Sequence, residues 1–359
     1  MADTVERLAE HWRLFAETSC GRYSPLYDRI SRAVAGDDEL LALLLQAPLP
    51  GQQPVLVLAA VHYLVLGGLD HSLTDVYAGR SDADPAPLFR DLCLSHRDRL
   101  LELLATRRTQ TNEVGRSAVL GPALSVVADR LGTPLALVDV GSSAGLNLRC
   151  DHYRLDYGEL GATGPADAPV SIGCRVVAGR PPVADRLPPI AARVGIDRAP
   201  VDLDDPDATR WLLACTWPDT ARIARTERAV AEARADPPPV VAGEALEVLG
   251  GVLDRLDPRA IACVTTTWVM AYLRRAEREQ FVTLLTNAGR KRPIAWISAE
   301  DPAVLPHLGS GDTELPSHDG TRPSVLGLTV LGAGTADEEP DATLLGFVHP
   351  HGLWMDWRA

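Results

Sequence analysis

The sequence predicts an α/β protein with an open, mostly parallel sheet, an N-terminal helical region and a C-terminal antiparallel pair of strands. Apolar residues before about residue 116 recur at helical spacing, whereas from residue 135 short β-branched runs alternate with helical stretches. Two strand-like runs then follow one another near the end of the chain. We therefore expect a helical cap over residues 1–116 and a sheet domain over residues 117–359 of the 359-residue chain.

The helical region begins with Val5, Leu8, Trp12 and Phe15, whose spacing places them on one face of a helix. Proline near the start and glycine near the end mark further helices. These are expected over residues 37–47, 54–66 and 87–107, and over a stretch with Pro122 near its start and Gly132 just past its end. No strand is expected before residue 135.

The sheet is indicated by short apolar runs that Gly, Pro and polar residues separate. Its expected strands are residues 135–140, 170–178, 192–197, 239–242, 260–267 and 293–298. Helical patterns over 220–236 and 274–289 lie between strands, as parallel crossovers require. The runs 323–334 and 342–357 flank an acidic, glycine-containing turn and predict the antiparallel pair.

The composition argues against several classes of protein. A formal charge of −13 disfavours binding to a phosphate backbone, and the apolar stretch 54–69 is too short to span a bilayer. The acidic N-terminus does not resemble a signal peptide. Six scattered cysteines without C-x-x-C spacing indicate reduced thiols. We expect a cytoplasmic protein with a small-molecule substrate and without nucleic-acid, membrane or metal partners; the oligomeric state stays open.

The segment "VDVGSSAGLN" (138–147) is an apolar strand that passes Asp139 into a glycine turn, with a helix expected from about Leu146. A turn of this kind presents backbone N–H groups and a helix N-terminus to a ligand, and its glycines let the ligand approach. Ser143 replaces the second glycine of the dinucleotide pattern G-x-G-x-x-G, and the G-K-[S/T] ending of a phosphate-binding loop is missing. The segment therefore argues against NAD and nucleoside triphosphates.

The pattern D-x-G-x-x-x-G resembles the first motif of class I S-adenosylmethionine (SAM) methyltransferases. The resemblance implies a Rossmann-like, class I methyltransferase-type sheet and SAM as the cofactor. It also implies that Asp139 lies near the ammonium group of SAM, directly or through water. The other residues implied at the cofactor by this motif are Gly141, Ser142, Ser143, Gly145 and Asn147.

A second segment, "RVGIDRAPVDLDD" (193–205), resembles the second motif of that class, a strand that ends in an acid. Asp197 is the matching residue, and the resemblance implies that its carboxylate accepts both ribose hydroxyls. The expected strand 170–178 competes for the same position in the sheet and ends without an acid. The sequence therefore leaves open which strand supplies the ribose-binding acid.

Two further segments resemble the later motifs in the same order along the chain. "VVAGEALEVL" resembles the third motif and implies that Glu244 and Ala245 contact the adenine edge. "AIACVTTTWVMAYL" resembles the fourth strand, whose end faces the transferred methyl group. The resemblance implies Thr267 at the cofactor and Trp268 and Tyr272 in the catalytic region.

The polar segment "TRRTQTNEVGR" (106–116) offers many hydrogen-bond donors and acceptors and almost no apolar anchor. Such a cluster either caps a helix and faces water, or folds over the carboxyl edge of the sheet and contacts the substrate. The substrate-binding candidates are Arg108, Thr111, Asn112 and Arg116. If the acceptor must lose a proton, His152, shortly after the glycine turn, is the candidate catalytic base.

Two alternatives to the methyltransferase hypothesis remain. Residues 141–145 also match G-x-S-x-G, the nucleophile elbow of α/β-hydrolases, with Ser143 as nucleophile and Asp301 and His349 following in the required order. An elbow normally follows several strands, however, and everything before residue 135 is expected to be helical. The other alternative is a protein that keeps the fold and only binds a ligand.

The whole chain is also similar to an uncharacterised bacterial family, domain-of-unknown-function family 2332. The similarity is carried by "RRTQTNEVGR", "VDVGSSAGLN", "VGIDRAPVDLDDPDATRWL" and "RPIAWISAED". It implies no activity. It does imply that the helical region and the sheet belong together in one protein unit.

Overall fold

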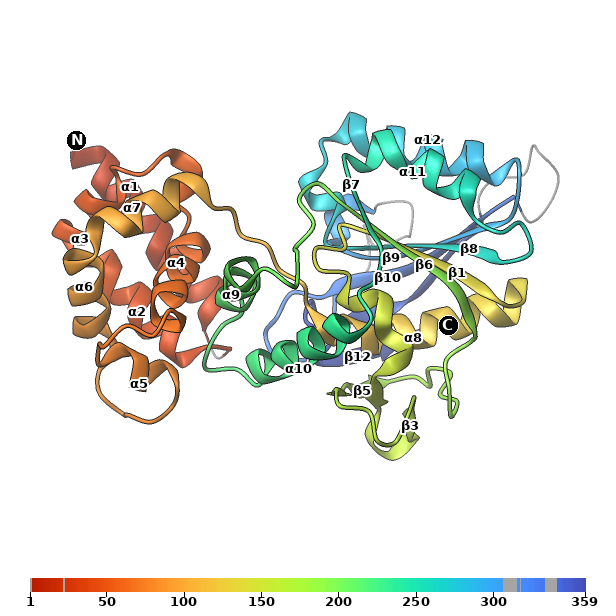
Figure 1. Cartoon of the computed structure of the whole chain (residues 1–359), viewed down its shortest axis with the longest axis horizontal. Coiled ribbons are helices and arrows are strands. Elements are labelled where there is room, and N and C mark those ends of the chain that lie inside the picture. Colours follow the sequence, from red (N-terminus) through yellow and green to blue (C-terminus); the bar gives the residue numbers. More distant parts are fainter. Residues whose placement is uncertain (1, 22, 306–314, 317, 333–340) are drawn as a thin grey trace. The chain divides into compact units, whose positions relative to one another are not determined.

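A computed structural model describes residues 2–21, 23–305, 315–316, 318–332 and 341–359, and the chain divides into two compact units (Figure 1). The helical unit consists of residues 1–111 and 204–227, and the sheet unit of residues 112–203 and 228–359. The first division thus falls at 111/112, where the sequence predicts 116/117. Residues 204–227 lie between two strands in sequence, yet they pack with the helical unit.

The helical unit is built from short helices joined by tight turns. Its helices are α1 (Ala2–Phe15), α2 (Pro25–Ala35), α3 (Asp38–Leu44), α4 (Pro54–Leu66), α5 (Leu73–Tyr77), α6 (Pro85–Ser95), α7 (Arg97–Thr106) and α9 (Pro206–Ala214), with a π-helical turn η1 (Ala16–Cys20) and a 3-10 turn η2 (Leu49–Gln52). The single helix expected over 87–107 is two helices, because the backbone of His96 leaves the helical region at φ −115° and ψ 28°.

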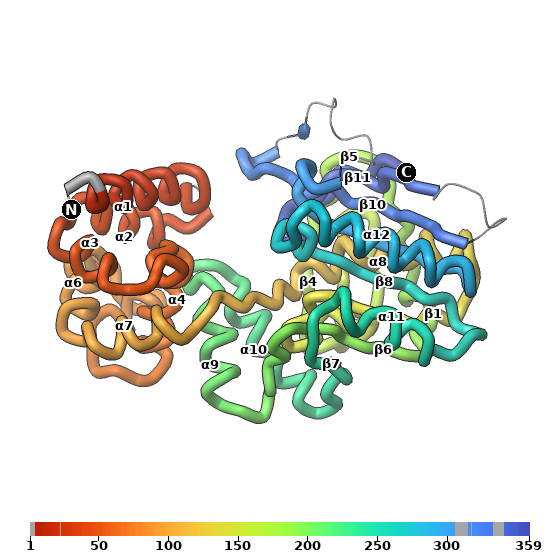
Figure 2. Tube along the Cα trace, turned by 90° about the horizontal axis from the view of Figure 1, so that it is seen from above, coloured from red at the N-terminus to blue at the C-terminus, as the bar shows by residue number. Residues whose placement is uncertain are grey.

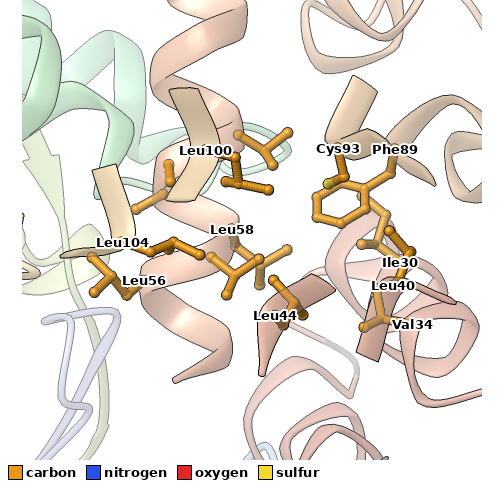
Figure 3. Packing of buried hydrophobic residues seen from close by; sticks show 14 of the residues in the cluster. Ile30, Val34, Leu40, Leu44, Leu56, Leu58, Phe89, Cys93, Leu100 and Leu104 are labelled. Carbon is orange, nitrogen blue, oxygen red and sulfur yellow. The ribbon is translucent and has the colours of Figure 1, made fainter. Parts of the chain in front are cut away.

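The core of the helical unit surrounds α4, which is apolar on all sides and buried along most of its length. Leu58 of α4, Ile30 of α2 and Phe89 of α6 are among the buried side chains that pack together there (Figure 3). Trp211 of α9 belongs to the same apolar cluster, which explains why α9 joins this unit. Among the described residues, no helix combines the length and apolar character needed to cross a bilayer.

The sheet unit contains a large sheet and a small one. Within the described residues the large sheet has nine strands, β1 (Leu135–Val140), β5 (Arg175–Ala178), β6 (Ile190–Asp197), β7 (Val240–Ala242), β8 (Ile261–Thr267), β9 (Ile294–Glu300), β10 (Ser324–Leu331), β11 (Asp341–Val348) and β12 (Trp354–Trp357). The small sheet contains β2 (Arg154–Asp156), β3 (Ala162–Thr163) and β4 (Ser171–Gly173).

The large sheet is mostly parallel, in the order β5-β12-β11-β10-β9-β8-β1-β6-β7. Strands β7, β6, β1, β8 and β9 are parallel neighbours, and β10, β11 and β12 follow as antiparallel strands. Figure 2 shows β6 and β7 toward one edge and β11 and β5 toward the other. The C-terminal antiparallel pair is thus confirmed, and the sheet extends beyond it.

Helices cover both faces of the large sheet. Helices α11 (Ala245–Arg255) and α12 (Arg275–Gly289) lie on one face, and α8 (Ser117–Leu131) lies on the other (Figure 1). The first face carries an apolar core that includes Val138, Val264, Trp296 and Phe281. Helix α10 (Arg222–Ala235) begins in the helical unit and ends in the sheet unit.

The five parallel strands, numbered along the chain, stand in the order 3-2-1-4-5. This order reverses direction between β1 and β8, and ligands of open α/β sheets bind outside the carboxyl ends of the strands at such a reversal. Since β6 neighbours β1, the strand that ends at Asp197 occupies the second position. The competing stretch 170–178 forms β4 and β5, which lie in different sheets away from β1.

Three local expectations are wrong. The run 342–357 is two strands, β11 and β12, because the chain reverses between them. Helix α8 begins at Ser117, so Pro122 lies inside it. The helix expected from Leu146 is a 3-10 segment, η4 (Leu146–His152), because the backbone of Arg149 leaves the helical region at φ −103° and ψ 20°.

Candidate ligand site

Acidic side chains lie at the carboxyl ends of four parallel strands. Asp139 lies near the end of β1, Asp197 and Glu300 end β6 and β9, and Glu244 follows β7. Because parallel strands place their carboxyl ends at one edge, these residues share that edge of the sheet. Sequence reasoning missed Glu300, although "RPIAWISAED" shows the same signal as the others, a buried apolar strand ending in an acid.

Asp139 is buried and held by the strand beside it. It stands opposite Thr265 of β8, whose Oγ1 donates a hydrogen bond of 2.7 Å to Asp139 Oδ1. Burial raises the pKa of Asp139 to about 7, the positive charge of Arg116 acts in the opposite direction, and the negative charge of Asp197 adds to the increase. The protonation state of Asp139 therefore changes near neutral pH.

The glycine turn, residues 141–145, is fixed by its own backbone amides. The N–H groups of Gly141 and Ser142 donate to Ile196 O at 2.8 and 3.1 Å. The N–H of Ser143 donates to Asp197 Oδ2 at 2.7 Å. The N–H of Gly145 donates to Ser142 O at 2.7 Å. The expectation that the turn presents free amides to a ligand is therefore wrong for these four groups.

The two glycines of the turn are explained by packing within the protein. Gly141 and Gly145 have φ values of +74° and +72°, a region that L side chains rarely adopt. A Cβ on Gly141 would lie 2.6 Å from Val269 Cγ2, and one on Gly145 would lie 2.7 Å from Pro238 Cγ. At these points the protein's own side chains occupy the space in which a ligand is expected from the sequence.

The two serines of the turn are buried. Ser143 has a positive φ of 55°, which is unusual for a residue other than glycine. Within the described residues, neither Ser142 Oγ nor Ser143 Oγ has a hydrogen-bond partner. Ser142 packs against Gly195 of β6, where a Cβ would lie 2.4 Å from Ser142 Oγ. The hydroxyl of Ser143 is therefore not paired with a histidine base.

Asp197 and Glu244 lie at the ends of neighbouring strands. Besides the N–H of Ser143, Asp197 accepts the N–H of Ala199 at 2.9 Å. Glu244 is exposed, and its Oε1 pairs with Arg198 Nε at 2.8 Å. Ala245 is the first residue of α11. Asp197 therefore supports the turn directly, and its two carboxylate oxygens retain the capacity to accept further hydrogen bonds.

The polar segment is divided between the two units. Arg108 and Thr111 belong to the helical unit, where Arg108 O accepts a hydrogen bond of 2.8 Å from Trp211 Nε1. Asn112 is buried in the sheet unit, and its Oδ1 accepts the N–H of Leu146 at 2.9 Å. The four substrate-binding candidates are therefore divided between the units, with Arg108 and Thr111 in one and Asn112 and Arg116 in the other.

Arg116 and Asn147 make hydrogen bonds to other residues of the sheet unit. Arg116 Nη1 donates to Thr267 O at 2.9 Å, and its Nε donates to Pro350 O at 2.9 Å. Asn147 Oδ1 accepts a hydrogen bond of 2.9 Å from Ser117 Oγ at the start of α8. Arg116 thus connects the end of β8 to the turn between β11 and β12.

The three catalytic candidates lie in different surroundings. His152 Nδ1 lies 3.0 Å from Glu232 Oε1 and 3.1 Å from Arg149 Nη2, within a group of charged side chains. Trp268, with a φ of 60°, donates from Nε1 to Ser324 Oγ at 2.9 Å. Tyr272, in the 3-10 turn η6 (Met270–Tyr272), is 81% exposed. Within the described residues, no hydrogen bond, ion pair or ring contact joins these three side chains.

Glu300 supports the loop that follows β8. It is fully buried and accepts the N–H of Val269 at 2.9 Å. Burial raises its pKa to about 7, although hydrogen bonding to the Val269 N–H acts in the opposite direction. Since Val269 fills the space beside Gly141, Glu300 acts on the glycine turn through this loop.

The hydrolase candidates Asp301 and His349 make other contacts. Asp301 Oδ1 accepts the N–H of Ala303 at 2.8 Å and caps the 3-10 turn η7 (Pro302–Val304). His349 Nδ1 accepts the N–H of His351 at 2.9 Å. Within the part of the chain that the structure describes, no group of three or more His, Cys, Asp or Glu side chains is arranged to hold a metal ion.

Comparison with known proteins identifies a family and no activity. The model of a family described as "uncharacterized protein conserved in bacteria (DUF2332)" matches residues 9–357, which include both units. No curated protein matches the chain.

Proposed function

The chain belongs to the DUF2332 family, and for this member we propose a SAM-dependent methyltransferase that acts on a small acceptor. The site of the proposed reaction is the carboxyl edge of β7, β6, β1 and β8. The class I methyltransferase-type identity of the sheet is part of the same proposal.

One observation carries the proposal, namely the row of acids in the 3-2-1-4-5 sheet. Glu244, Asp197 and Asp139 follow one another across three neighbouring strands beside the point where the strand order reverses. The polar groups of SAM in the same order are the adenine amine, the ribose hydroxyls and the ammonium group, all of which donate hydrogen bonds. Carboxylates are the strongest acceptors that side chains offer to such donors.

The paired amides of the glycine turn support a ligand without phosphate. Phosphates bind to unpaired N–H groups at a helix N-terminus or glycine loop. Here the amides of Gly141, Ser142, Ser143 and Gly145 bind protein oxygens, and η4 is a short 3-10 segment. These features argue against a dinucleotide and are compatible with SAM.

The residues of the edge would bind and orient the two reactants. Asp139 would hold the ammonium group, Asp197 the ribose, and Glu244 with the N–H of Ala245 the adenine edge. SAM, when bound, supplies a methyl group that its sulfonium already activates. The protein then has to align the acceptor near Thr267 and Trp268 and keep water away.

Calorimetric titration with SAM and with its demethylated product tests the proposal. We expect binding, and we expect Asp197→Asn to weaken it about tenfold or more, because a charge-assisted hydrogen bond is lost. Asp257→Asn is the matched control, since Asp257 precedes β8 at the opposite edge of the sheet. Binding should strengthen as pH rises through about 7, where Asp139 ionises. No heat with either compound at pH 8 would overturn the proposal.

Transfer of the methyl group is tested separately from binding. Incubation with SAM that carries a labelled methyl group, together with a bacterial small-molecule extract, should give a labelled product. Binding without any labelled product would instead support a ligand-binding protein with this fold.

A serine hydrolase is the second candidate, favoured by the positive φ of Ser143 and by its Oγ, which has no hydrogen-bond partner among the described residues. A strained serine in a G-x-S-x-G turn is the geometry of a nucleophile elbow. The burial of Ser143 and the absence of a base on its hydroxyl within the described residues make this the weaker candidate. Labelling by a fluorophosphonate that Ser143→Ala abolishes would support it.

A further inference from the structure

The polypeptide passes between the helical unit and the sheet unit at 111/112, 203/204 and 227/228. On the sheet side, a residue close in sequence to each connection makes a hydrogen bond to the same short stretch of chain. That stretch is residues 143–149, the end of the glycine turn and the start of η4, here called the turn segment.

The first two connections bond to the backbone of the turn segment. Asn112, the first residue of the sheet unit, accepts the N–H of Leu146 at 2.9 Å. Val201, two residues before the second connection, donates its N–H to Ser143 O at 3.2 Å. Two residues of the turn segment, Ser143 and Leu146, are therefore each held by a residue close to a connection.

The third connection is made by α10, which runs without a break from the helical unit into the sheet unit. In the sheet unit its Glu232 accepts hydrogen bonds from Arg149 Nε at 2.7 Å and Arg149 Nη2 at 2.5 Å. Arg149 is 2% exposed and its Nη1 also reaches Asp236 Oδ2 at 2.9 Å. A buried two-point pairing of this kind fixes both position and orientation.

On the helical side, the first two connections are tied to each other. Arg107 pairs with Asp207, and Trp211 Nε1 donates to Arg108 O at 2.8 Å. These contacts join the chain just before 111/112 to the chain just after 203/204. A change in the helical unit at this point therefore acts on two connections together.

We propose that the helical unit sets the conformation of the turn segment through these three connections, with Asn112 and Arg149 as positioning residues. The inference stands without the proposed function, except that its ligand experiment depends on SAM binding.

Hydrogen–deuterium exchange of the ligand-free, full-length protein tests the coupling. Asp207→Asn removes the pair with Arg107, and both residues belong to the helical unit. We expect the amides of Ser143 and Leu146 to exchange about threefold faster or more, because local opening is governed by the contacts that hold a segment. Arg107→Gln removes the same pair from its other side and should have the same effect.

Asp75→Asn is the matched control, because it removes the exposed Arg80–Asp75 pair of the same unit, which is distant in sequence from the three connections. Exchange in β9 (residues 294–300) reports global unfolding and should not change in any variant. The proposal is overturned if Asp207→Asn and Arg107→Gln both speed exchange at residues 107–111 and leave residues 143–146 as in the wild type.

A ligand experiment tests whether a change at the turn segment also affects the connections. Adding the demethylated product of SAM should slow exchange at residues 109–113 and 201–204 as well as in the turn segment, since coupling acts both ways. If that compound does not bind, the proposed function fails while the ligand-free experiment still decides the coupling. If it binds and protects the turn segment alone, the coupling is overturned and the proposed function stands.

Discussion

The helical unit and the sheet unit both bury ionisable side chains, and burial shifts the pKa values of these side chains in opposite directions. In the helical unit, burial lowers the pKa of His62 to about 4, and His62 Nδ1 bonds to Ala214 O at 3.1 Å. In the sheet unit, burial raises the pKa values of Asp139 and Glu300 to about 7. His62 is therefore neutral at physiological pH, whereas the two carboxyl groups titrate there.

The difference supports the proposed placement of the reaction in the sheet unit. Groups that change protonation near the working pH are the ones that active sites use. Asp139 and Glu300 share the edge of the sheet where the strand order reverses, while His62 lies inside a helical core. Variants made in matched pairs, one in each unit, test this difference.

The largest effect is expected in the two cores. Leu58→Ala in the helical unit and Leu285→Ala in the sheet unit each remove a buried side chain from a different apolar cluster. Each should lower the free energy of unfolding of its own unit by about 2–5 kcal/mol. Differential scanning calorimetry should show each variant lowering a different transition. A single transition that both variants lower equally would contradict the division into two cores.

The pH dependence of stability should have opposite signs in the two units. Between about pH 4 and pH 7 the folded sheet unit keeps protons on Asp139 and Glu300 that the unfolded chain has lost, so its stability falls as pH rises. The folded helical unit lacks the proton that unfolded His62 binds, so its stability rises between about pH 4 and pH 6.5.

Each of these slopes can be removed by one substitution. Asp139→Asn should flatten much of the fall in the sheet unit, and His62→Gln the rise in the helical unit, each by a few kcal/mol over the range, at about 1.4 kcal/mol per pKa unit. Urea unfolding from pH 4 to pH 8, followed by exchange in each unit, is the measurement. Slopes of the same sign in both units would refute the comparison.

The next comparison concerns two glycines with similar φ values, where the expected difference between the variants is smaller than the effect in the cores. Gly68 of the helical unit has a φ of +82° and open space where a Cβ would lie, so Gly68→Ala should destabilise by about 1–2 kcal/mol through backbone strain alone. Gly141→Ala adds a clash with Val269 and should destabilise by about 1–3 kcal/mol more. Adding Val269→Ala should recover part of that difference. Equal effects at the two glycines would show that the loop after β8, which carries Val269, moves aside without a measurable energetic cost.

The smallest effect is expected from exposed ion pairs. Asp75→Asn breaks the pair with Arg80 in the helical unit, and Asp254→Asn breaks the pair with Lys291 in the sheet unit. Both pairs are more than half exposed, so each variant should change the free energy of unfolding by at most about 0.5 kcal/mol. A larger change in either unit, measured by urea unfolding, would mean that the pair stabilises more of the structure than its own two residues.

The central strands could be predicted because their signal is local. A buried parallel strand is a continuous apolar run with punctuation at both ends, and β1, β7 and β8 begin and end within one residue of the expected bounds. The acids Asp139, Asp197 and Glu244 could be placed at strand ends for the same reason.

The partners of these residues could not be predicted, because they depend on register and tertiary packing. Thr265 reaches Asp139 only because β8 pairs with β1 in that register. Asn112 and Ser117 hold Leu146 and Asn147, and the segment they hold is a 3-10 turn where local sequence predicts a helix. Likewise, the amphipathic pattern of 204–227 does not specify which of two cores it covers.

All six cysteines are reduced and buried, and burial raises the pKa of each thiol. Toward maleimide reagents, the folded wild-type protein should behave as though it carried no thiol. One exposed cysteine introduced into each unit would then accept a donor and an acceptor fluorophore without any prior removal of native cysteines. Energy transfer between the two dyes would report how the spacing of the units responds to a ligand in solution.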